Sequence, residues 1–120
     1  MHTVNASTFR VLALGGDGIG PEVTDAAITV LEQAAGASGL RIDLEHDLLG
    51  GAAYDQHGVF CTDDTVDKAV RAHAVLVGAV GGPKWDQIKI DGGPQDKDGL
   101  MRLRKTLNVY ARQRPARGYP

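Results

Sequence analysis

The chain has 120 residues, of which 42% are hydrophobic and 23% charged, and its net charge at pH 7 is −2. This composition is typical of a globular domain. No apolar stretch approaches the roughly 20 residues that span a bilayer, and the net charge argues against nucleic-acid binding by the whole chain. A single cysteine, Cys61, excludes an internal disulfide and favours a reducing compartment. Because no basic region followed by an apolar segment opens the chain, we expect a cytoplasmic protein.

The chain opens with a predicted strand, a glycine-rich turn and a helix. Residues 9–14 are nearly all apolar and predict a buried strand that ends at Gly15-Gly16. Pro21 suits the first residue of a helix, and Gly36 and Gly39 end its apolar pattern. The expected inward face of this helix consists of Val23, Ala27, Val30, Leu31 and Ala34.

Residues 40–47 alternate apolar and charged side chains, which predicts a half-buried strand, and residues 48–61 predict no regular element. Thr62 can cap a helix whose inward residues are Val66, Ala69 and Val70. Residues 74–80 form another continuous apolar strand, and residues 81–98 form a long loop of the kind that is often functional. A short helix over 99–107 and a strand over 109–113 complete the pattern.

Strands and helices thus alternate, which indicates an α/β fold with a mainly parallel sheet and flanking helices. The glycine-rich loops 15–20 and 78–83 both leave carboxyl ends of predicted strands. Ligands of open α/β sheets bind at that edge, so we expect a site there.

Glycines in the first loop do not form a standard dinucleotide fingerprint. From Gly16, the pattern G-x-G-x-x-G requires glycine where Pro21 stands, and from Gly18 it fails at Val23. The loop also lacks the Lys-Ser/Thr ending of a phosphate-binding P-loop. A tight glycine turn that leads into a helix explains it equally well.

Residues 78–86 combine close-approach glycines with the charge of Lys84 and the flat surface of Trp85. They could bind a ligand, although a turn with a tryptophan that covers the core explains the composition better. No serine–histidine–acid set or metal-ligand spacing is visible.

Charge is divided unevenly along the chain. Residues 1–98 hold seven bases against all 15 acids, a balance of −8, whereas the six bases after Asp98 are accompanied by no acid. Arginine donates two parallel hydrogen bonds to a carboxylate or phosphate. Arg104 and Arg114, ten residues apart, could reach one anion, whereas Arg102, Lys105 and Arg112 are expected to be solvated surface charges.

Three segments together resemble the 3-isopropylmalate dehydrogenases, which belong to the β-decarboxylating dehydrogenases. They are residues 16–23 (GDGIGPEV), residues 78–86 (GAVGGPKWD) and residues 99–115, with Gly99-Leu100-Met101, Arg104-Lys105 and Arg114-Pro115. The resemblance runs from about Phe9 to Ala116. It implies an isopropylmalate dehydrogenase-like fold rather than a standard Rossmann fold.

The resemblance also implies an activity and the residues that serve it. The family oxidises the 2-hydroxyl of its substrate by hydride transfer to NAD⁺, and the resulting β-keto acid loses CO₂ with the help of Mg²⁺ or Mn²⁺. Arg104 and Arg114 would bind the substrate carboxylates, and Leu100 and Met101 would line the pocket for the isopropyl group. The implied cofactor-binding residues are Ile19, Gly81, Gly82, Pro83, Lys84, Trp85 and Asp86.

Family members are roughly three times longer than this chain, so the resemblance implies an N-terminal portion that is incomplete and, alone, inactive. Residues 1–8 would be a loosely ordered start, 9–116 the first half of one domain with the start of the next, and 117–120 a truncated end. The metal ligands and proton-transfer residues would lie beyond residue 120, so no catalytic or metal-binding residue is expected within the chain. The parent protein is expected to be a homodimer in leucine biosynthesis.

Two departures from the family pattern affect the expected site. Lys97 stands where the family usually has glutamate, and Arg112-Gln113 replaces the usual Asn-Leu. Related tartrate, homoisocitrate or isocitrate dehydrogenases therefore stay open as alternatives. Another alternative is a small anion- or RNA-binding module that uses the basic tail with Tyr110 and Tyr119, although the acidic body argues against nucleic acid.

Overall fold

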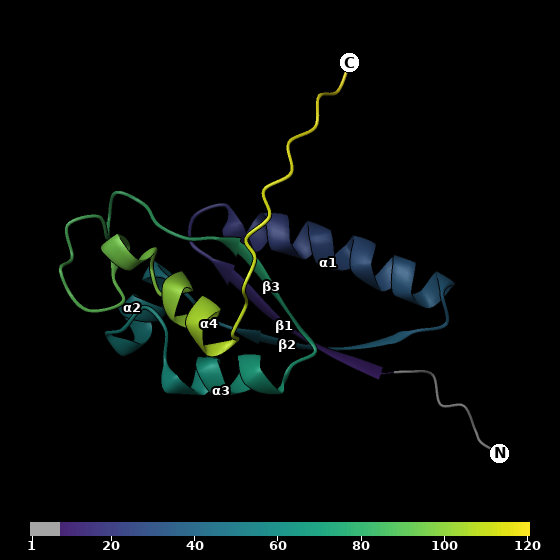
Figure 1. The fold of residues 1–120 in the computed structure, drawn as a ribbon, viewed down its shortest axis with the longest axis horizontal. Helices are drawn as coiled ribbons and strands as arrows, with labels where there is room; N and C mark the ends of the chain where they lie inside the picture. Colours follow the sequence, from purple (N-terminus) through teal and green to yellow (C-terminus); the bar gives the residue numbers. More distant parts are fainter. Residues whose placement is uncertain (1–7) are drawn as a thin grey trace.

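Three parallel strands form the centre of the structure, a computed structural model that describes residues 8–120. β1 (Thr8–Gly16) lies between β2 (Arg41–Asp47) and β3 (Ala74–Ala79), in the order β2-β1-β3 (Figure 1). Both pairings are parallel, and Leu12 lies opposite Glu45 on one side and Val75 on the other. The predicted mainly parallel α/β fold is confirmed.

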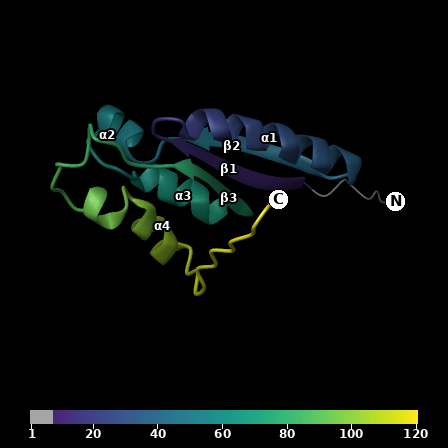
Figure 2. The same ribbon diagram turned by 90° about the horizontal axis from the view of Figure 1, so that it is seen from above.

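Helices cover both faces of this sheet. Figure 2 shows α1 (Gly20–Ala37) on one face and α3 (Asp63–Arg71) with α4 (Leu100–Thr106) on the other. The core on the α3 side is apolar, and its buried members are Leu12, Leu14, Leu49, Cys61, Val66, Ala69 and Leu103. Alternate β1 residues, Val11 and Ala13, are buried as well, as expected for a central strand whose side chains point alternately to the two faces.

The long loop between β3 and α4 lies beyond the carboxyl ends of the strands, together with α2 (Gly51–His57) (Figure 1). It contains one short 3₁₀ helix, η1 (Pro94–Asp96). Thr62 caps α3 as predicted, because its hydroxyl accepts a hydrogen bond from the Thr65 N–H at 3.1 Å. No helix within residues 8–120 has the length and apolar character needed to cross a membrane.

The expectation of an irregular segment over 48–61 was wrong, because α2 occupies its centre. Gly50, with φ 79°, precedes the helix and offers no side chain to cap it. The first two helical N–H groups, of Gly51 and Ala52, donate instead to Asp17, which is 34 and 35 positions away. A cap so distant in sequence leaves no local signal.

A strand over residues 109–113 was also expected, and the structure shows none. The segment after α4 is exposed and pairs with no other strand. Apolar and β-branched residues favour a strand only when a neighbouring strand supplies its hydrogen bonds. The loosely ordered start expected at 1–8 lies outside the described residues except for Thr8, which begins β1.

The inward face of α1 differs from the predicted one. Gly20, Thr24, Ile28 and Ala35 are buried, whereas Val23 and Val30 are 45% and 68% exposed. Both sets recur at helical spacing, so periodicity could not choose between them. The face that packs on the sheet is the one that can approach it closely. A Cβ atom added at Gly78 of β3 would lie 2.4 Å from the Thr24 Oγ1, so glycine at this position lets the Thr24 face of the helix approach the strand. The helix also passes through Gly36 and ends at Ala37, while Val70 of α3, expected inside, is 57% exposed.

Candidate functional site

Both glycine-rich loops meet at the carboxyl edge of the sheet, as the sequence predicts, and Asp17 joins them. Its own N–H donates to the Ala79 carbonyl at 2.7 Å. The buried Asp17 carboxylate accepts three backbone N–H groups, from Gly51 at 2.8 Å, Ala52 at 2.7 Å and Gly81 at 2.9 Å. One side chain therefore fixes the end of β1, the start of α2 and the loop after β3 relative to one another.

Sequence analysis missed this role of Asp17, although one signal was available. An acidic residue inside a glycine-rich turn, at the end of a buried strand, has several backbone N–H groups within its reach. We define the Asp17 junction as Asp17 together with Gly51, Ala52 and Gly81.

The segment 81–86, expected to border a cofactor, lies directly on this junction. Gly81 donates to Asp17, and Lys84 and Trp85 both bind the carboxylate of Asp55 on α2. A Cβ atom added at Gly82 would lie 3.3 Å from the Trp85 ring. Trp85 thus covers the start of α2. The sequence predicted a tryptophan that covers the core, and the structure agrees in part, because the ring lies on a helix end.

The remaining expected cofactor residues surround the same edge. Ile19 precedes α1 and is 67% exposed, and a Cβ atom added at the adjacent Gly18 would meet no atom within 4 Å. Pro83 and Asp86 are exposed. The turn after β1 therefore leaves open space beside an exposed apolar side chain.

Asp98, which sequence analysis also missed, is a second buried acid here. It is 6% exposed, and its Oδ1 has no hydrogen-bond partner among the described residues. A Cβ atom added at Gly81 would lie 3.1 Å from the Asp98 Oδ2. Burial raises the pKa of Asp98, and the nearby charges of Asp17 and Asp86 raise it further.

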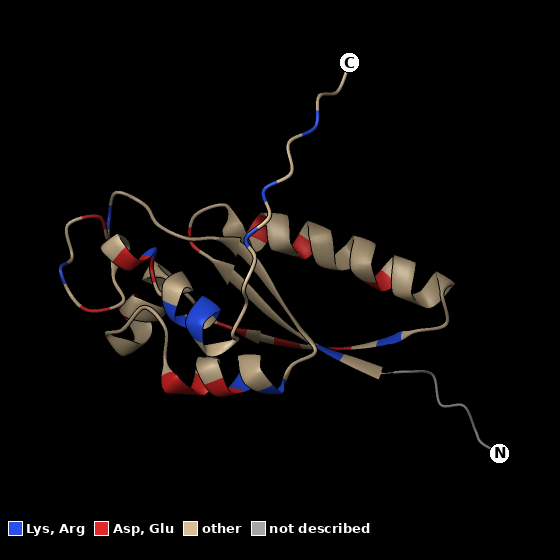
Figure 3. Cartoon of the chain, viewed as in Figure 1, with Lys and Arg blue, Asp and Glu red and all other residues tan. Residues whose placement is uncertain are grey.

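Lys97, which precedes Asp98 in the sequence, lies within the electrostatic influence of three arginines; we define the cation cluster as Lys97, Arg104, Arg112 and Arg114. The charge of Arg112, the loss of hydration, and the charges of Arg104 and Arg114 all lower the pKa of Lys97. The two arginines singled out from the sequence, Arg104 and Arg114, therefore act on the same lysine. Figure 3 shows the basic residues of α4 and of the following segment in blue.

Arg104 has an unused hydrogen-bond donor within this cluster. Its Nη1 is buried and makes no hydrogen bond to any described residue, and none of the ion pairs within residues 8–120 involves the cation cluster. A buried guanidinium donor without a partner is costly. Beside it lies a cavity of about 300 Å³ lined by Met101, Arg104, Lys105, Val109, Tyr110, Ala111 and Arg112.

α4 presents Arg104 to this cavity because other residues anchor the helix. Leu103 is buried and Leu100 packs against the apolar core, whereas Met101 is 38% exposed. Arg102, expected to be a solvated charge, instead donates to the Cys61 carbonyl at 2.7 Å and pairs with Asp63. The hydrogen bond to Asp63 raises the pKa of Arg102. Arg102 thus ties α4 to the start of α3.

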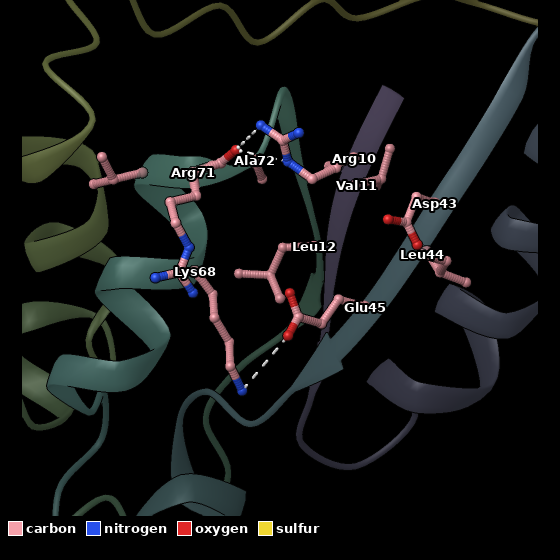
Figure 4. A pocket seen from close by; sticks show the side chains of 10 residues that line it. Arg10, Val11, Leu12, Asp43, Leu44, Glu45, Lys68, Arg71 and Ala72 are labelled. Atoms are coloured by element: carbon pink, nitrogen blue, oxygen red, sulfur yellow. Dashed lines mark hydrogen bonds and ion pairs between the residues drawn. The ribbon is translucent and has the colours of Figure 1, made fainter. Parts of the chain in front are cut away.

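Another hollow, of about 630 Å³, lies between α3 and the strands β1 and β2 (Figure 4). Three of its charged side chains, those of Arg10, Glu45 and Lys68, are engaged. The Arg10 guanidinium donates to the Arg71 carbonyl at 2.8 and 3.1 Å, and the Lys68 Nζ lies 3.9 Å from the Glu45 Oε2. None of the buried side-chain atoms that lack a hydrogen-bond partner among residues 8–120 belongs to this hollow, whereas one belongs to the cation cluster.

Metal ligands were expected outside this chain. Across residues 8–120, no group of three or more His, Cys, Asp or Glu side chains is arranged to hold a metal ion. The divalent ion implied by the family resemblance therefore has no ligand set among these residues.

The geometry defines an α/β protein whose candidate ligand site lies at the carboxyl edge of a parallel sheet, between a glycine-rich junction and a group of arginines. Comparison with known proteins makes this specific. Residues 10–120 match the family model for isocitrate/isopropylmalate dehydrogenase, and the chain belongs to this family.

Its relatives include 3-isopropylmalate dehydrogenase of Pseudomonas fluorescens, 50% identical over 111 residues, which are 92% of this chain and 30% of that protein. The enzyme of the same name from Hydrogenovibrio crunogenus is 48% identical over 113 residues, which are 94% of this chain and 31% of that protein. The chain therefore spans about a third of the length of these relatives.

Solved structures give the same fold. The β-decarboxylating dehydrogenase of Thermococcus kodakarensis in its apo form matches with a TM-score of 0.66 and 31% identity, over 85% of this chain and 27% of that one. Isocitrate dehydrogenase of Methylococcus capsulatus matches with a TM-score of 0.62 and 26% identity, over 83% and 26%. The expected isopropylmalate dehydrogenase-like fold is thus confirmed.

Proposed function

We propose that this chain supplies the carboxylate-binding arginines and one side of the cofactor site of an NAD-dependent oxidative decarboxylase in leucine biosynthesis. Its substrate would be a 2-hydroxy dicarboxylic acid, namely 3-isopropylmalate. The observation that carries this proposal is the cation cluster with its unpartnered, buried Arg104 Nη1. The names of the relatives support the choice of substrate.

Substrate binding would satisfy the unused donors of the cluster. A carboxylate that reaches the Arg104 Nη1 accepts a charge-assisted hydrogen bond and removes the cost of the buried, unpaired donor. Arg114 would bind the second carboxylate. The exposed, flexible Met101 suits contact with a small branched alkyl group, while Leu100 would support it from the core side.

The cofactor would bind against the open end of β1 and the segment 81–86. Its nicotinamide ring would take the hydride that leaves the hydroxyl-bearing carbon of the substrate. Ile19 would offer an apolar surface, and the Asp17 junction would hold the two glycine-rich loops at a fixed separation. Residues beyond this chain would supply the metal ligands, the proton-transfer groups and the dimer contacts. The chain alone is therefore proposed to bind substrate and cofactor weakly and not to catalyse.

Ligand titration of the purified chain tests the proposal. We expect 3-isopropylmalate to bind by calorimetry and to bind more tightly than malate, which lacks the isopropyl group. Arg104→Gln should weaken binding about tenfold, because a charge-assisted hydrogen bond is lost. The matched control is Arg41→Gln, which removes an exposed charge from β2. Equal affinities for Arg104→Gln and the parent would contradict the assignment. Salt-dependent binding of RNA instead of the dicarboxylates would favour the RNA-binding alternative.

A further inference from the structure

The Asp55 carboxylate on α2 accepts hydrogen bonds from two consecutive residues of the segment 81–86. Its Oδ1 accepts a hydrogen bond from the Trp85 Nε1 at 3.1 Å, and its Oδ2 accepts one from the Lys84 Nζ at 2.8 Å. The same Lys84 Nζ lies 5.4 Å from the centroid of the Trp85 ring, within range of a cation–π contact. One carboxylate therefore fixes both the charge and the aromatic ring of this segment.

Beneath the ring, Gly51 makes the contact possible. A Cβ atom added there would lie 2.1 Å from the Trp85 ring, so only glycine lets the indole lie on the first turn of α2. Gly51 also donates its N–H to Asp17. The segment 81–86 is thus held at two points, with Gly81 on Asp17 and the Lys84–Trp85 pair on Asp55.

These two attachments differ in their exposure to water. Asp17 is buried, whereas the side chain of Asp55 is 40% exposed and that of Lys84 is 68% exposed. An ion pair as exposed as this one contributes little to global stability. A contact that adds little stability but fixes two adjacent side chains of a loop acts mainly on the loop's position. The hydrogen bond from Lys84 and then that from Trp85 lower the pKa of Asp55, so its carboxylate is charged at neutral pH.

We infer that Asp55 is a positioning residue, which holds Trp85 and Lys84 against α2 and thereby sets the segment 81–86 in the geometry that the cofactor meets. The part of this inference that concerns the cofactor rests on the proposed function. The attachment itself does not, because it is a property of residues 51–86 alone.

Trp85 is the only tryptophan of the chain, so its indole N–H gives a single resonance in a ¹H–¹⁵N spectrum. Exchange of that proton with solvent reports how often the attachment opens. We expect Asp55→Ala to accelerate exchange about fivefold, as the loss of one hydrogen bond predicts. Gln56→Ala, an exposed neighbour on the same helix, should leave the rate unchanged. Unchanged exchange in folded Asp55→Ala would overturn the inference.

NAD⁺ binding to the same variants tests the consequence for the cofactor. Asp55→Ala should raise the NAD⁺ dissociation constant about fivefold while the urea midpoint stays at that of Gln56→Ala. Equal affinity in Asp55→Ala and the parent would overturn the positioning role. If the parent itself binds no NAD⁺, the proposed function loses its cofactor, whereas indole exchange still decides the attachment.

Two gentler variants keep the inference testable if Asp55→Ala does not fold. Asp55→Asn keeps an oxygen for the Trp85 N–H but removes the charge that pairs with Lys84. Lys84→Met removes the same ion pair from the other side and keeps an apolar side chain on the ring. Both should accelerate indole exchange by similar factors. Acceleration in neither of them would overturn the inference.

Discussion

The Asp17 junction and the cation cluster lie at the same edge of the sheet but differ in whether their charges have partners within the chain. At the junction, one buried carboxylate is fully occupied by three backbone N–H groups. In the cluster, the charges of three arginines act on Lys97, none of the ion pairs among the described residues involves these four cations, and one buried donor is unused. The junction is complete without a ligand, whereas under the proposed function an anion would complete the cluster. A cluster of charged residues therefore indicates a ligand site only when those residues lack partners within the protein.

Asp17→Ala should have the largest effect, because it breaks the junction. Three backbone N–H groups lose their acceptor, and two of them start α2. We expect a loss of about 3 kcal/mol in the free energy of unfolding, measured by urea denaturation. Asp25→Ala, which removes an exposed acid from α1, is the matched control and should change the midpoint little. A similar small change in Asp17→Ala would show that the junction does not hold the loops together.

Gly51→Ala sharpens the comparison from the packing side. The added Cβ would overlap the Trp85 ring, so the ring must move, at a cost of about 2 kcal/mol. Gly36→Ala is the matched control, because an added Cβ in α1 meets no atom within 4 Å. It should stabilise the chain by about 0.5–1 kcal/mol through helix propensity. Destabilisation of equal size in both variants would contradict the close packing of Trp85 on Gly51.

Lys97→Glu tests the cluster by giving it an internal partner. The new carboxylate would face three arginines, so repulsion becomes attraction and the urea midpoint should rise. Affinity for 3-isopropylmalate should fall, since the carboxylate competes for the arginines. Lys89→Glu, in the same loop but outside the cluster, is the control. Calorimetry that shows tighter dicarboxylate binding by Lys97→Glu would contradict the cluster as the anion site.

Asp98→Asn should have a small effect, and its size depends on pH. The folded-state pKa of Asp98 is raised by burial and by Asp17 and Asp86, so folding disfavours its ionised form. Its contribution to stability is present below the ordinary pKa of 3.8 and is lost as pH rises through the folded-state value. Asp98→Asn should therefore stabilise the chain at neutral pH, and this gain should vanish in acid. Asparagine also tolerates the φ of 55° at this position.

Asp47 provides the contrasting case for the same titration. Burial raises its pKa, but hydrogen bonds from Leu48, Thr65 and Lys68 outweigh burial and lower it. Its contribution is present above the ordinary pKa of 3.8 and is lost as pH falls through the lower folded-state value. Asp47→Asn should thus destabilise the chain at neutral pH. The urea midpoints of Asp98→Asn and Asp47→Asn, measured from acid to neutral pH, test both pKa directions. Stability changes of the same sign in the two variants at neutral pH would contradict them.

Local patterns predicted most of the fold. The strands, α1, α3 and α4 follow from apolar periodicity and from signals such as Pro21 and Thr62, which act within one helical turn. The meeting of both glycine-rich loops follows from the general rule for parallel sheets. α2 could not be predicted because Asp17, far away in sequence, caps it. The supposed strand over 109–113 lacked a partner, which no local pattern reveals.

The candidate site was predicted unevenly for a similar reason. Arg104 and Arg114 stand out because no acid follows Asp98 in the sequence. Asp17, Asp55 and Asp98 looked like ordinary acids, since their roles depend on groups 29 to 64 positions away or on burial. Arg102 was misjudged because its partners, Cys61 and Asp63, lie on a different segment. Spacing alone does not distinguish an occupied charge from an available one.

The strand order β2-β1-β3 has a consequence for the behaviour of the chain in concentrated solution. β2 and β3 each have one neighbour within the described sheet, so each presents a row of N–H and C=O groups to which another chain can add a strand. Alternating charges on β2, at Arg41, Asp43 and Glu45, oppose such addition, whereas β3 carries no charge at all. Self-association by strand addition would therefore start at β3. A single lysine on its outward side would oppose this association.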